Sequence, residues 1–491
     1  MIGLIILGVV VLFLAVLVIR ALMFKPIPQP KLEADTIDFD KDSAVSALQQ
    51  LVRCKTVSNV DPALEDDAEF EKLIGLLPEL YPDIWKACTF QRFPDRGILF
   101  HWKGKASDKP SVMMAHYDVV PVDDAYLWEK DPFCGDIENG VMWGRGTLDT
   151  KVTMNGALSA ANHLAKQGFQ PAQDIYFAFS GGEEVNGKGA PNIVAYFEEN
   201  GIVPELVLDE GGAVVENVFP GVKEPCGMIG IAEKGMINVR YSVVSSGGHA
   251  SAPLPKTPIL SLSNMCRNVL RNPFPMKLSA PTALLFDTLG RRSTFVYKLI
   301  FSNLWCFMPI LDMICKKSGG EMNALVRTTT AFTQMEGSPG RNVLPAEAHM
   351  ISNMRLIPGD TVESAVEYLH KVAADEEVKI IVLEGNNPSP VSQVDCDSYR
   401  KVAAAVSTTW DGCITSPYLM VQCSDSRHYG KISDKVYRFS AMDLTKEERG
   451  SIHGNNERIR LETLYKSVLI SENELSFPIS VEIFHPHNST R

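Results

Sequence analysis

The sequence predicts an α/β fold with a mainly parallel central sheet and helices on both faces. Short apolar segments typical of buried strands alternate with segments of helical periodicity through the first half of the chain. Several of these apolar segments end in His, Asp or Glu, as expected where a crevice lies outside the carboxyl ends of parallel strands. The chain has 491 residues, 45% of them hydrophobic and 22% charged, so it can bury a large core.

The chain begins with an apolar segment. Residues 2–19 are all apolar or glycine, which is long enough to cross a bilayer core of about 30 Å. We predict a transmembrane anchor over residues 1–24, because a cleaved signal peptide would normally have basic residues before a shorter apolar run. The basic residues Arg20, Lys25 and Lys31 follow the run and favour a cytoplasmic body. Residues 25–41 are predicted to be a proline-containing spacer.

Residues 42–235 are predicted to form the first part of a catalytic domain. Strand-like and helical segments alternate there, which predicts parallel strands joined by helices. The predicted helices are 42–52, 153–167 and 190–199, and the predicted strands are 97–102, 111–115, 174–179 and 205–208. Residues 389–491 are predicted to return to this domain, with helices at 399–409 and 461–475.

Residues 236–388 are predicted to form an inserted α+β domain. Its elements occur in β-α-β-β-α-β order, at 237–244, 258–270, 328–334, 346–356, 361–373 and 378–383. This order predicts a small antiparallel sheet backed by two helices. Residues 274–327 form an apolar insertion. A second transmembrane helix at 295–315 is rejected because of its polar residues, which leaves a lipophilic lid or channel wall and an ordinary buried helix pair as open interpretations.

Composition limits the partners of the protein. The formal net charge of -12 argues against binding to nucleic acid, which needs a basic face. The ten cysteines are scattered without a C-x-x-C motif, which is typical of free thiols in a reducing compartment.

Four strand-like segments end in possible metal ligands. His116-Tyr-Asp118 closes one segment, Glu183-Glu184 follows the next, and Asp209-Glu210 ends a third, while Asp149 lies in Gly144-Arg-Gly-Thr-Leu-Asp149. Buried carboxylates are costly unless they are paired or bound to a cation. Histidine with several carboxylates suits a divalent ion of the zinc class, and a bridging carboxylate permits two ions.

The same residues suggest roles in hydrolysis. Asp149 is the natural bridging ligand, and Asp118 is placed to accept the second N–H of His116 and fix its tautomer. Glu183 and Glu184 point to opposite faces of a regular strand, so one should bind metal while the other transfers protons. Metal-activated water with a carboxylate base predicts cleavage of an amide bond.

The chain resembles the M20 family of metallopeptidases, in the branch with carboxypeptidase S, aminoacylase-1 and the N-acyl-amino-acid synthase/hydrolases. Matching motifs run in order through nearly everything after the spacer. They are His116-Tyr-Asp118, Gly144-Arg-Gly-x-x-Asp149-x-Lys151, Glu183-Glu184-Val, Asp209-Glu210-Gly-Gly, Ser246-Gly-Gly-His249-Ala-Ser, Asn342-Val-Leu-Pro345, Ser424-Asp-Ser-Arg427 and Ile452-His453-Gly. The resemblance implies a di-zinc peptidase fold in which the inserted domain acts as a lid and dimerisation unit.

The resemblance also implies residue roles. Two Zn²⁺ ions per subunit are expected, although other divalent ions are possible, with His116 on one ion, Asp149 bridging, and Glu184 and His453 on the other. Glu183 is expected to be the general base. The remaining ligand is Asp209 or Glu210, with a slight preference for Asp209.

Further residues are implied for substrate binding. His249 resembles a family histidine that stabilises the oxyanion, often across a dimer interface, so a homodimer is expected. Asn342, Arg355 and Arg427 match positions that hold the substrate carboxylate or the oxyanion, and a planar guanidinium suits this task.

These observations lead to a functional hypothesis. We expect a membrane-tethered zinc amidohydrolase or carboxypeptidase that cleaves an amide bond next to a free carboxylate, in short peptides or N-acyl amino acids. The apolar insertion favours a hydrophobic acyl group or side chain. The alternatives are an aminopeptidase or dipeptidase of the same fold, and a catalytically silent membrane-tethered binding protein.

Overall fold

The computed structural model describes residues 1–491 except 33–36, 123–124, 218, 376 and 478–491. The helices are α1 (Ile2–Met23), α2 (Lys41–Val52), α3 (Asp67–Leu80), α4 (Pro82–Ala87), α5 (Lys151–Lys166), α6 (Gly189–Glu199), α7 (Pro258–Arg271), α8 (Ala280–Gly290), α9 (Phe295–Phe301), α10 (Leu304–Ser318), α11 (Gly320–Val326), α12 (Val362–Ala373), α13 (Asp397–Thr409), α14 (Lys446–Ser451) and α15 (Leu461–Ser476). The short helices η3 (Glu183–Val185) and η4 (Asp425–Lys431) lie near the candidate site.

The strands form one large sheet and three smaller ones among the described residues. The large sheet contains β1 (Cys88–Phe93), β2 (Gly97–Trp102), β6 (Gln173–Ser180), β3 (Ala106–His116), β7 (Leu206–Asp209), β17 (Val436–Arg438), β9 (Cys226–Glu233), β8 (Val214–Val215) and β18 (Asp443–Leu444) in spatial order, with β16 (Ile414–Met420) paired to β9. The other strands are β4 (Ile137–Glu138), β5 (Val141–Trp143), β10 (Gly235–Val244), β11 (Gly248–His249), β12 (Thr329–Glu336), β13 (Val343–Leu344), β14 (Glu347–Leu356), β15 (Lys379–Asn386) and β19 (Arg458–Arg460).

The central sheet is mixed, which corrects the expectation of a mainly parallel sheet. Strands β6, β3, β7 and β17 are parallel neighbours, as the alternation of strands and helices predicted. However, β1–β2–β6 are antiparallel, and β9 runs antiparallel to β8 and β17. The β1–β2 connection explains one of these departures. It is a tight turn through Asp95 and Arg96, both with positive φ, and so short a connection can join only antiparallel strands.

Helices cover both faces of the central sheet, as predicted. On β3, Met113 and Ala115 belong to the core that contains residues of α2, α5 and α15. Val112 and Met114, which alternate with them, pack with Phe197 of α6 on the opposite face. Side chains on a strand alternate between faces, so apolar residues at consecutive positions of β3 pack against the helices on both faces of the sheet.

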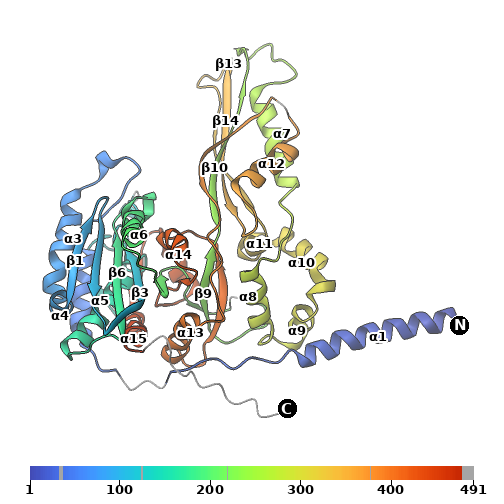
Figure 1. Ribbon diagram of the computed structural model, residues 1–491. Coiled ribbons are helices and arrows are strands. Elements are labelled where there is room, and N and C mark those ends of the chain that lie inside the picture. Colours follow the sequence, from blue (N-terminus) through green and yellow to red (C-terminus); the bar gives the residue numbers. More distant parts are fainter. Residues whose placement is uncertain (33–36, 123–124, 218, 376, 478–491) are drawn as a thin grey trace.

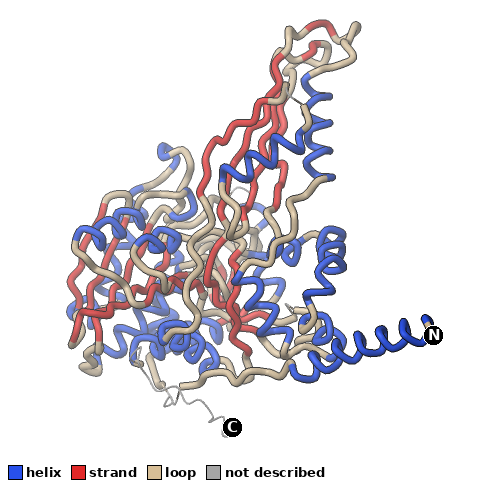
Figure 2. The backbone as a smooth tube through the Cα atoms, turned by 45° about the vertical axis from the view of Figure 1, so that its right-hand side comes forward, coloured by secondary structure: helices blue, strands red, loops and turns tan. Residues whose placement is uncertain are grey.

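Residues 235–386 contain an elongated arm that projects away from the central sheet (Figures 1 and 2). Its four-stranded sheet has the order β12-β14-β10-β15, and every neighbouring pair is antiparallel. Helices α7 and α12 pack on this sheet and on each other. The predicted β-α-β-β-α-β order is therefore present, whereas the role of this arm as a lid or dimerisation unit stays a prediction.

The apolar insertion forms the four helices α8 to α11 beside the central sheet. Helix α8 packs on β16 and is largely buried, while much of α10 is exposed. Among the described residues, α1 is long and apolar enough to cross a membrane, and α9 with α10 meets the same criterion only as a pair bent by 106°. The ten cysteines are free thiols in this structure.

Candidate active site

The predicted ligands meet at one edge of the central sheet. His116 is the last residue of β3, Glu183 and Glu184 form η3 directly after β6, and Asp209 ends β7. Because β6, β3 and β7 are adjacent parallel strands, their carboxyl ends lie side by side. Residues distant in sequence therefore reach one cleft.

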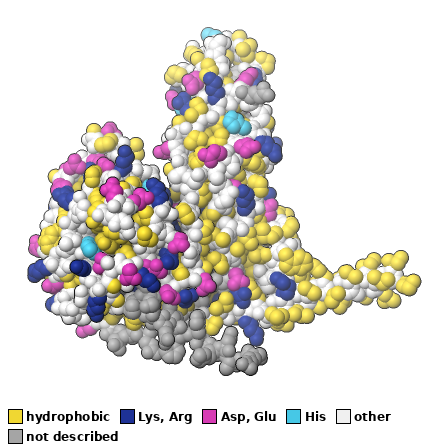
Figure 3. Space-filling view, viewed as in Figure 1, with side chains coloured by type: hydrophobic (Ala, Val, Ile, Leu, Met, Phe, Trp, Pro, Cys, Tyr) yellow, Lys and Arg dark blue, Asp and Glu magenta, His cyan; other side chains and the backbone are white. Residues whose placement is uncertain are grey.

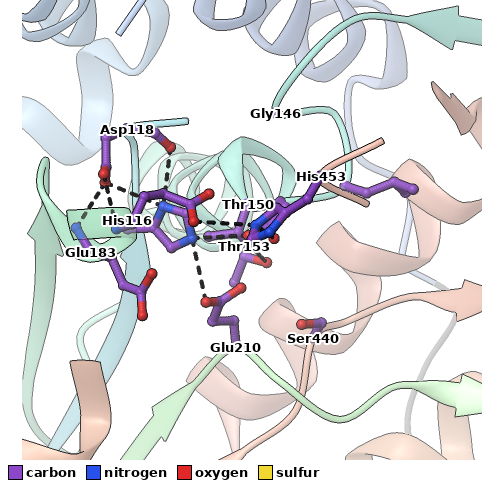
Figure 4. Close-up of polar contacts among 12 residues, drawn as sticks. His116, Asp118, Gly146, Thr150, Thr153, Glu183, Glu210, Ser440 and His453 are labelled. Carbon is purple, nitrogen blue, oxygen red and sulfur yellow. Dashed lines mark hydrogen bonds and ion pairs between the residues drawn. The ribbon is translucent and has the colours of Figure 1, made fainter. Parts of the chain in front are cut away.

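Asp149 lies between two histidines. Its Oδ1 is 3.0 Å from Nε2 of His116, and its Oδ2 is 3.0 Å from Nε2 of His453. Glu210 Oε1 is 3.3 Å from His116 Nε2 (Figure 4). Glu184 Oε2 is 3.2 Å from His453 Nε2. The site thus has two halves, each with one histidine and one glutamate, that share the carboxylate of Asp149.

His453 reaches this site from the C-terminal part of the chain with a backbone φ of 59°. This left-handed conformation is uncommon for a residue other than glycine and costs of the order of 1 kcal/mol. The surrounding structure must therefore stabilise the turn that carries it.

Asp118 organises the other end of the site. Its carboxylate is fully buried and accepts hydrogen bonds from the backbone N–H groups of Glu183 (3.1 Å) and Glu184 (3.2 Å) and from Ser58 Oγ (2.6 Å). Nδ1 of His116 lies 3.1 Å from the Asp118 carbonyl oxygen and 3.3 Å from its carboxylate. Asp118 therefore orients both His116 and the η3 turn.

The structure separates Asp209 from Glu210. Asp209 Oδ2 accepts a hydrogen bond from Ser426 N at 2.9 Å, so its carboxylate faces the η4 turn. Glu210 instead contacts His116. Consecutive side chains at a strand end point to opposite sides, so only one of the two carboxylates can face the shared site. The geometry therefore differs from the slight preference for Asp209.

The site has an excess of buried negative charge. Burial, together with Asp149, raises the pKa of Glu210 to about 8, and burial raises the pKa of Glu183 well above its ordinary value. Hydrogen bonds that His453 donates to the carboxylates of Asp149 and Glu184 raise the pKa of His453 to about 10. Crowded carboxylates of this kind are stabilised by any nearby positive charge, including a cation.

Glu457 is a positioning residue that the motifs did not assign. Its fully buried carboxylate accepts hydrogen bonds from the backbone N–H groups of Gly146 (3.1 Å), Leu148 (2.8 Å) and Asp149 (3.1 Å), and pairs with Arg145 Nη1 at 2.8 Å. It thus fixes the loop that presents Asp149. The only sequence feature that points to Glu457 is its position four residues after His453. A carboxylate that binds backbone N–H groups has no characteristic sequence motif, so its role could not be predicted.

The arginines lie next to the site. Arg427 donates to Ser424 O at 2.7 Å and to Asn186 Oδ1 at 3.0 Å, and although burial opposes its charge, the carboxylates of Asp425, Glu233 and Glu183 raise its pKa. Arg355 approaches from the base of β14, where its Nη1 is 3.3 Å from Cys423 Sγ. Cys423 lines the cleft beside Glu183.

His249 and Asn342 lie elsewhere. His249 is an exposed residue of β11, which pairs with β13 at the far end of the arm (Figure 1). Asn342 O accepts the N–H of Ala250, so both residues belong to this tip. The structure therefore does not bring them to the carboxylate cluster of the same chain.

The cluster opens into a cleft of about 680 Å³. One end contains Asp149, Glu183, Glu184, Glu210 and His453, and the walls are largely apolar. Wall residues that the motifs did not predict include Met228, Glu321, Ala324, Tyr418, Met420 and Arg449. A smaller cavity of about 30 Å³ between α8 and α11 shares Met228, Glu321 and Tyr418 with the cleft.

Comparison with known proteins gives a consistent assignment. The model of peptidase family M20/M25/M40 matches residues 112–473. The chain is 34% identical to a probable carboxypeptidase S-like 2 of Dictyostelium discoideum, over 93% of this chain and 90% of that one. It is 33% identical to the N-fatty-acyl-amino acid synthase/hydrolase PM20D1 of Xenopus tropicalis, over 87% and 84% of the two chains.

Solved structures share the fold. An M20 family metallo-carboxypeptidase, Sso-CP2 of Sulfolobus solfataricus, superposes with a TM-score of 0.65 at 17% identity, covering 88% of this chain and 98% of that one. Human carnosine dipeptidase 1 gives a TM-score of 0.61 at 15% identity, covering 89% and 96%. The matching family model and the curated relatives therefore lead to one conclusion, that this chain is a hydrolytic enzyme and belongs to peptidase family M20/M25/M40.

Proposed function

We propose that the protein is a two-zinc amidohydrolase that cleaves an amide bond next to a free carboxylate, in N-acyl amino acids or short peptides. The observation that carries this proposal is the position of Asp149, whose two oxygens each face a different histidine at 3.0 Å. A carboxylate shared in this way is suited to bridge two ions about 3.5 to 4 Å apart.

The donor set fits zinc. His116, Asp149 and Glu210 would hold one ion, and Asp149, Glu184 and His453 the other; these are the nitrogen and oxygen ligands that Zn²⁺ accepts. Oε1 of Glu184 is buried and has no hydrogen-bond partner among the described residues, which suits a ligand atom. Bound zinc would supply an acidified water and polarise the amide carbonyl.

The protein groups then divide the remaining work. Glu183 takes the proton from the water and returns it to the leaving amine, and the burial that raises its pKa favours this exchange. Asp118 holds the backbone of Glu183 in place. Arg427 and Arg355 offer positive charge beside the cleft for the substrate carboxylate.

A long apolar acyl group is the substrate feature that the cleft supports best. Met228, Ala324, Tyr418 and Met420 form apolar wall next to the carboxylate cluster. The small cavity between α8 and α11 extends this apolar surface. The insertion therefore acts as a channel wall in this proposal, and the N-fatty-acyl substrates named for the PM20D1 relatives agree with it.

Membrane attachment through α1 and assembly into a homodimer complete the proposal. Helix α1 is apolar along its length and extends away from the body (Figure 1). Its retention is supported by its contacts with α9, because a cleaved segment would not need a packed partner. His249, exposed at the arm tip, is available to the active site of a second subunit.

A substrate panel tests the proposal. The detergent-solubilised, zinc-loaded full chain should contain two zinc ions and hydrolyse a long-chain N-acyl amino acid faster than the matching N-acetyl amino acid. The carboxamide analogue of the long-chain substrate should be poor. Glu183→Gln should keep both ions and lose about 10²- to 10⁴-fold in kcat.

Other outcomes identify the alternatives. Cleavage that requires a free substrate amine and survives Arg427→Ala would indicate an aminopeptidase or dipeptidase. Two bound ions with no turnover of any substrate would indicate a binding protein.

A further inference from the structure

The exposed surface of α9 and α10 is strongly apolar and continuous with α1. Large apolar side chains at Phe295, Val296, Trp305, Ile310, Met313 and Ile314 are exposed. In the space-filling view, hydrophobic atoms cover the body where α1 leaves it and continue along that helix (Figure 3). A contiguous surface of this kind on a protein marks an interaction site.

Helices α9 and α10 pack on the second half of α1. Leu17 and Ala21 of α1 are buried, although most of the helix is exposed. The rings of Phe13 and Trp305 meet edge to face with their centroids 6.0 Å apart. The turn between α9 and α10 therefore lies against α1 well before the end of that helix.

This packing fixes the depth of the turn relative to α1. Phe13 is ten residues before Met23, the last residue of α1. At about 1.5 Å per residue this separation is about 15 Å, or half of a hydrocarbon core of about 30 Å. If α1 crosses a bilayer with Met23 at the surface next to the body, Trp305 must lie in the leaflet on that side.

The polar groups of the turn are satisfied within the protein. Asn303 is fully buried, and its Nδ2 donates to Leu17 O at 3.0 Å and to Leu299 O at 2.9 Å. Ser302 O accepts two hydrogen bonds from the guanidinium of Arg20, at 2.9 and 3.1 Å. Broken helices are tolerated at membrane depth only where such backbone groups find partners.

Basic residues lie at the ends of the pair. Lys316 and Lys317 are in the last turn of α10, and Arg291 and Arg292 follow α8 just before α9. Lys316 pairs with Asp312, and Arg291 and Arg292 donate to Lys25 O and Ile27 O just after α1, so basic groups lie at the level where that helix would leave the acyl region.

We infer that α9 and α10 form a re-entrant wedge that inserts into the lipid bilayer beside α1, so that the protein contacts the membrane through two elements. This inference rests on the proposed membrane role of α1 and is independent of the catalytic proposal. Helix α11 follows α10 and contributes Gly320, Glu321 and Ala324 to the cleft, so the wedge places this wall of the cleft next to the membrane.

Tryptophan quenching by brominated lipids tests the wedge in the full chain. The protein is reconstituted in phosphatidylcholine nanodiscs with or without acyl-chain bromines, and the emission of Trp305 is taken as the difference between wild type and Trp305→Phe. We expect Trp305 to lose about half or more of its emission in brominated lipid, because it lies within the hydrocarbon region. The matched control is the emission of Trp85 in α4, taken as the difference between wild type and Trp85→Phe. This emission should be the same in brominated and unbrominated lipid.

A second probe separates the wedge from the anchor. Leu7 is exposed on α1, and Leu7→Trp in the Trp305→Phe background reports the depth of that helix. Quenching at position 7 without quenching of Trp305 would overturn the wedge and keep the anchor. Absence of quenching at both positions would overturn both the wedge and the anchor. If a second copy of the chain shields Trp305 from lipid, position 7 is quenched and Trp305 is not, which also overturns the wedge.

Charge substitution provides an independent test. Met313→Asp should reduce the quenching of Trp305 by placing a charge in the acyl region, whereas Val60→Asp, at an exposed apolar residue on the catalytic unit, should leave it unchanged. Equal quenching in Met313→Asp and wild type would contradict the wedge.

Discussion

At the residue scale, buried polar atoms with several specific partners organise the candidate active site. Asp118 and Glu457 share this design, because each is fully buried and each accepts backbone N–H groups from the segment that carries a neighbouring functional residue. Each carboxylate is the acceptor for several donors, and its loss leaves those donors without a strong acceptor. Substitution of Asp118 or Glu457 should therefore change the site by displacing the backbone segments that these carboxylates hold.

Asp118→Asn should weaken zinc binding by about 10- to 100-fold, the range seen when the partner of a ligating histidine is changed. The amide retains the shape of the carboxylate, but it cannot accept as well from Glu183 N, Glu184 N and Ser58 Oγ. Chelator competition measures the affinity. Ser58→Ala, which removes one of the three donors, is the graded control, and unchanged affinity in Asp118→Asn would disprove the orienting role.

Lys234 gives a pH-dependent contribution to stability. Burial, with Arg355 nearby, lowers the pKa of Lys234 from 10.5 to about 7, and its Nζ donates to Ala324 O and Arg327 O at 2.9 Å. The folded chain releases this proton above a pH of about 7, whereas the unfolded chain keeps it to about 10.5. The unfolded state binds more protons in this window, so this residue makes the unfolding free energy rise with pH.

Lys234→Met should remove that contribution. The unfolding free energy of wild type relative to the variant should rise by up to about 1.4 kcal/mol per pH unit between pH 7 and 10. Denaturant unfolding in detergent at several pH values measures the difference. A difference that stays flat or falls with pH would show that the buried lysine keeps its proton.

At the element scale, the apolar content of a strand decides whether the sequence predicts it. Strands β2, β6 and β7 are apolar enough to stand out in the sequence, and their predicted ranges agree with the structure to within one residue, whereas β3 begins at Ala106, before its predicted start at residue 111. Strand β1 alternates exposed and half-buried residues and was missed. Its pairing with β2 through a tight turn, together with β9, makes the central sheet mixed. Sheet neighbours depend on long-range contacts that local periodicity does not encode.

Two glycines show how closely the elements approach one another. A Cβ on Gly212, two residues after Glu210, would lie 1.7 Å from Met228 O in β9, whereas a Cβ on Gly75 in α3 would meet nothing within 4 Å. The Asp209-Glu210-Gly-Gly motif is thus explained in part by contact between backbones, which only glycine permits.

Gly212→Ala should destabilise the protein by about 2 to 4 kcal/mol, because the clash is with backbone that cannot move away. Gly75→Ala should stabilise it by roughly 0.5 to 1 kcal/mol, since alanine is the better residue in an exposed helix. Thermal unfolding of both variants measures this contrast. Equal shifts of Tm in the two would contradict the close packing at Gly212.

At the scale of the whole molecule, the arm separates His249 from the carboxylate cluster of its own chain. The tip formed by β11 and β13 lies far from the central sheet (Figure 1). A side chain at this distance can serve catalysis only if a second subunit receives it. The proposed dimer would bring the two together.

Mixing two inactive variants tests this arrangement. If His249 acts in the partner's site, His249→Ala and Glu183→Gln should each be inactive, while subunit exchange at equal amounts should restore about a quarter of wild-type activity, because half of the dimers gain one intact site. Hydrolysis before and after exchange measures the recovery. An active His249→Ala enzyme, or the absence of recovery in verified heterodimers, would exclude the role.

The sequence by itself determined the family, the apolar N-terminal helix and the set of residues that converge on the site, because these depend on local periodicity and on motifs at strand ends. Only the tertiary structure decided that Glu210 rather than Asp209 faces His116, since a shift of one residue along a strand reverses the side to which a carboxylate points. The structure also decided the mixed sheet, the place of His249 at the arm tip and the packing of α9 and α10 on α1. These features depend on contacts between distant segments, such as the hydrogen bond between Asn303 and Leu17, which are 286 residues apart, and such contacts follow from the packing of the whole chain.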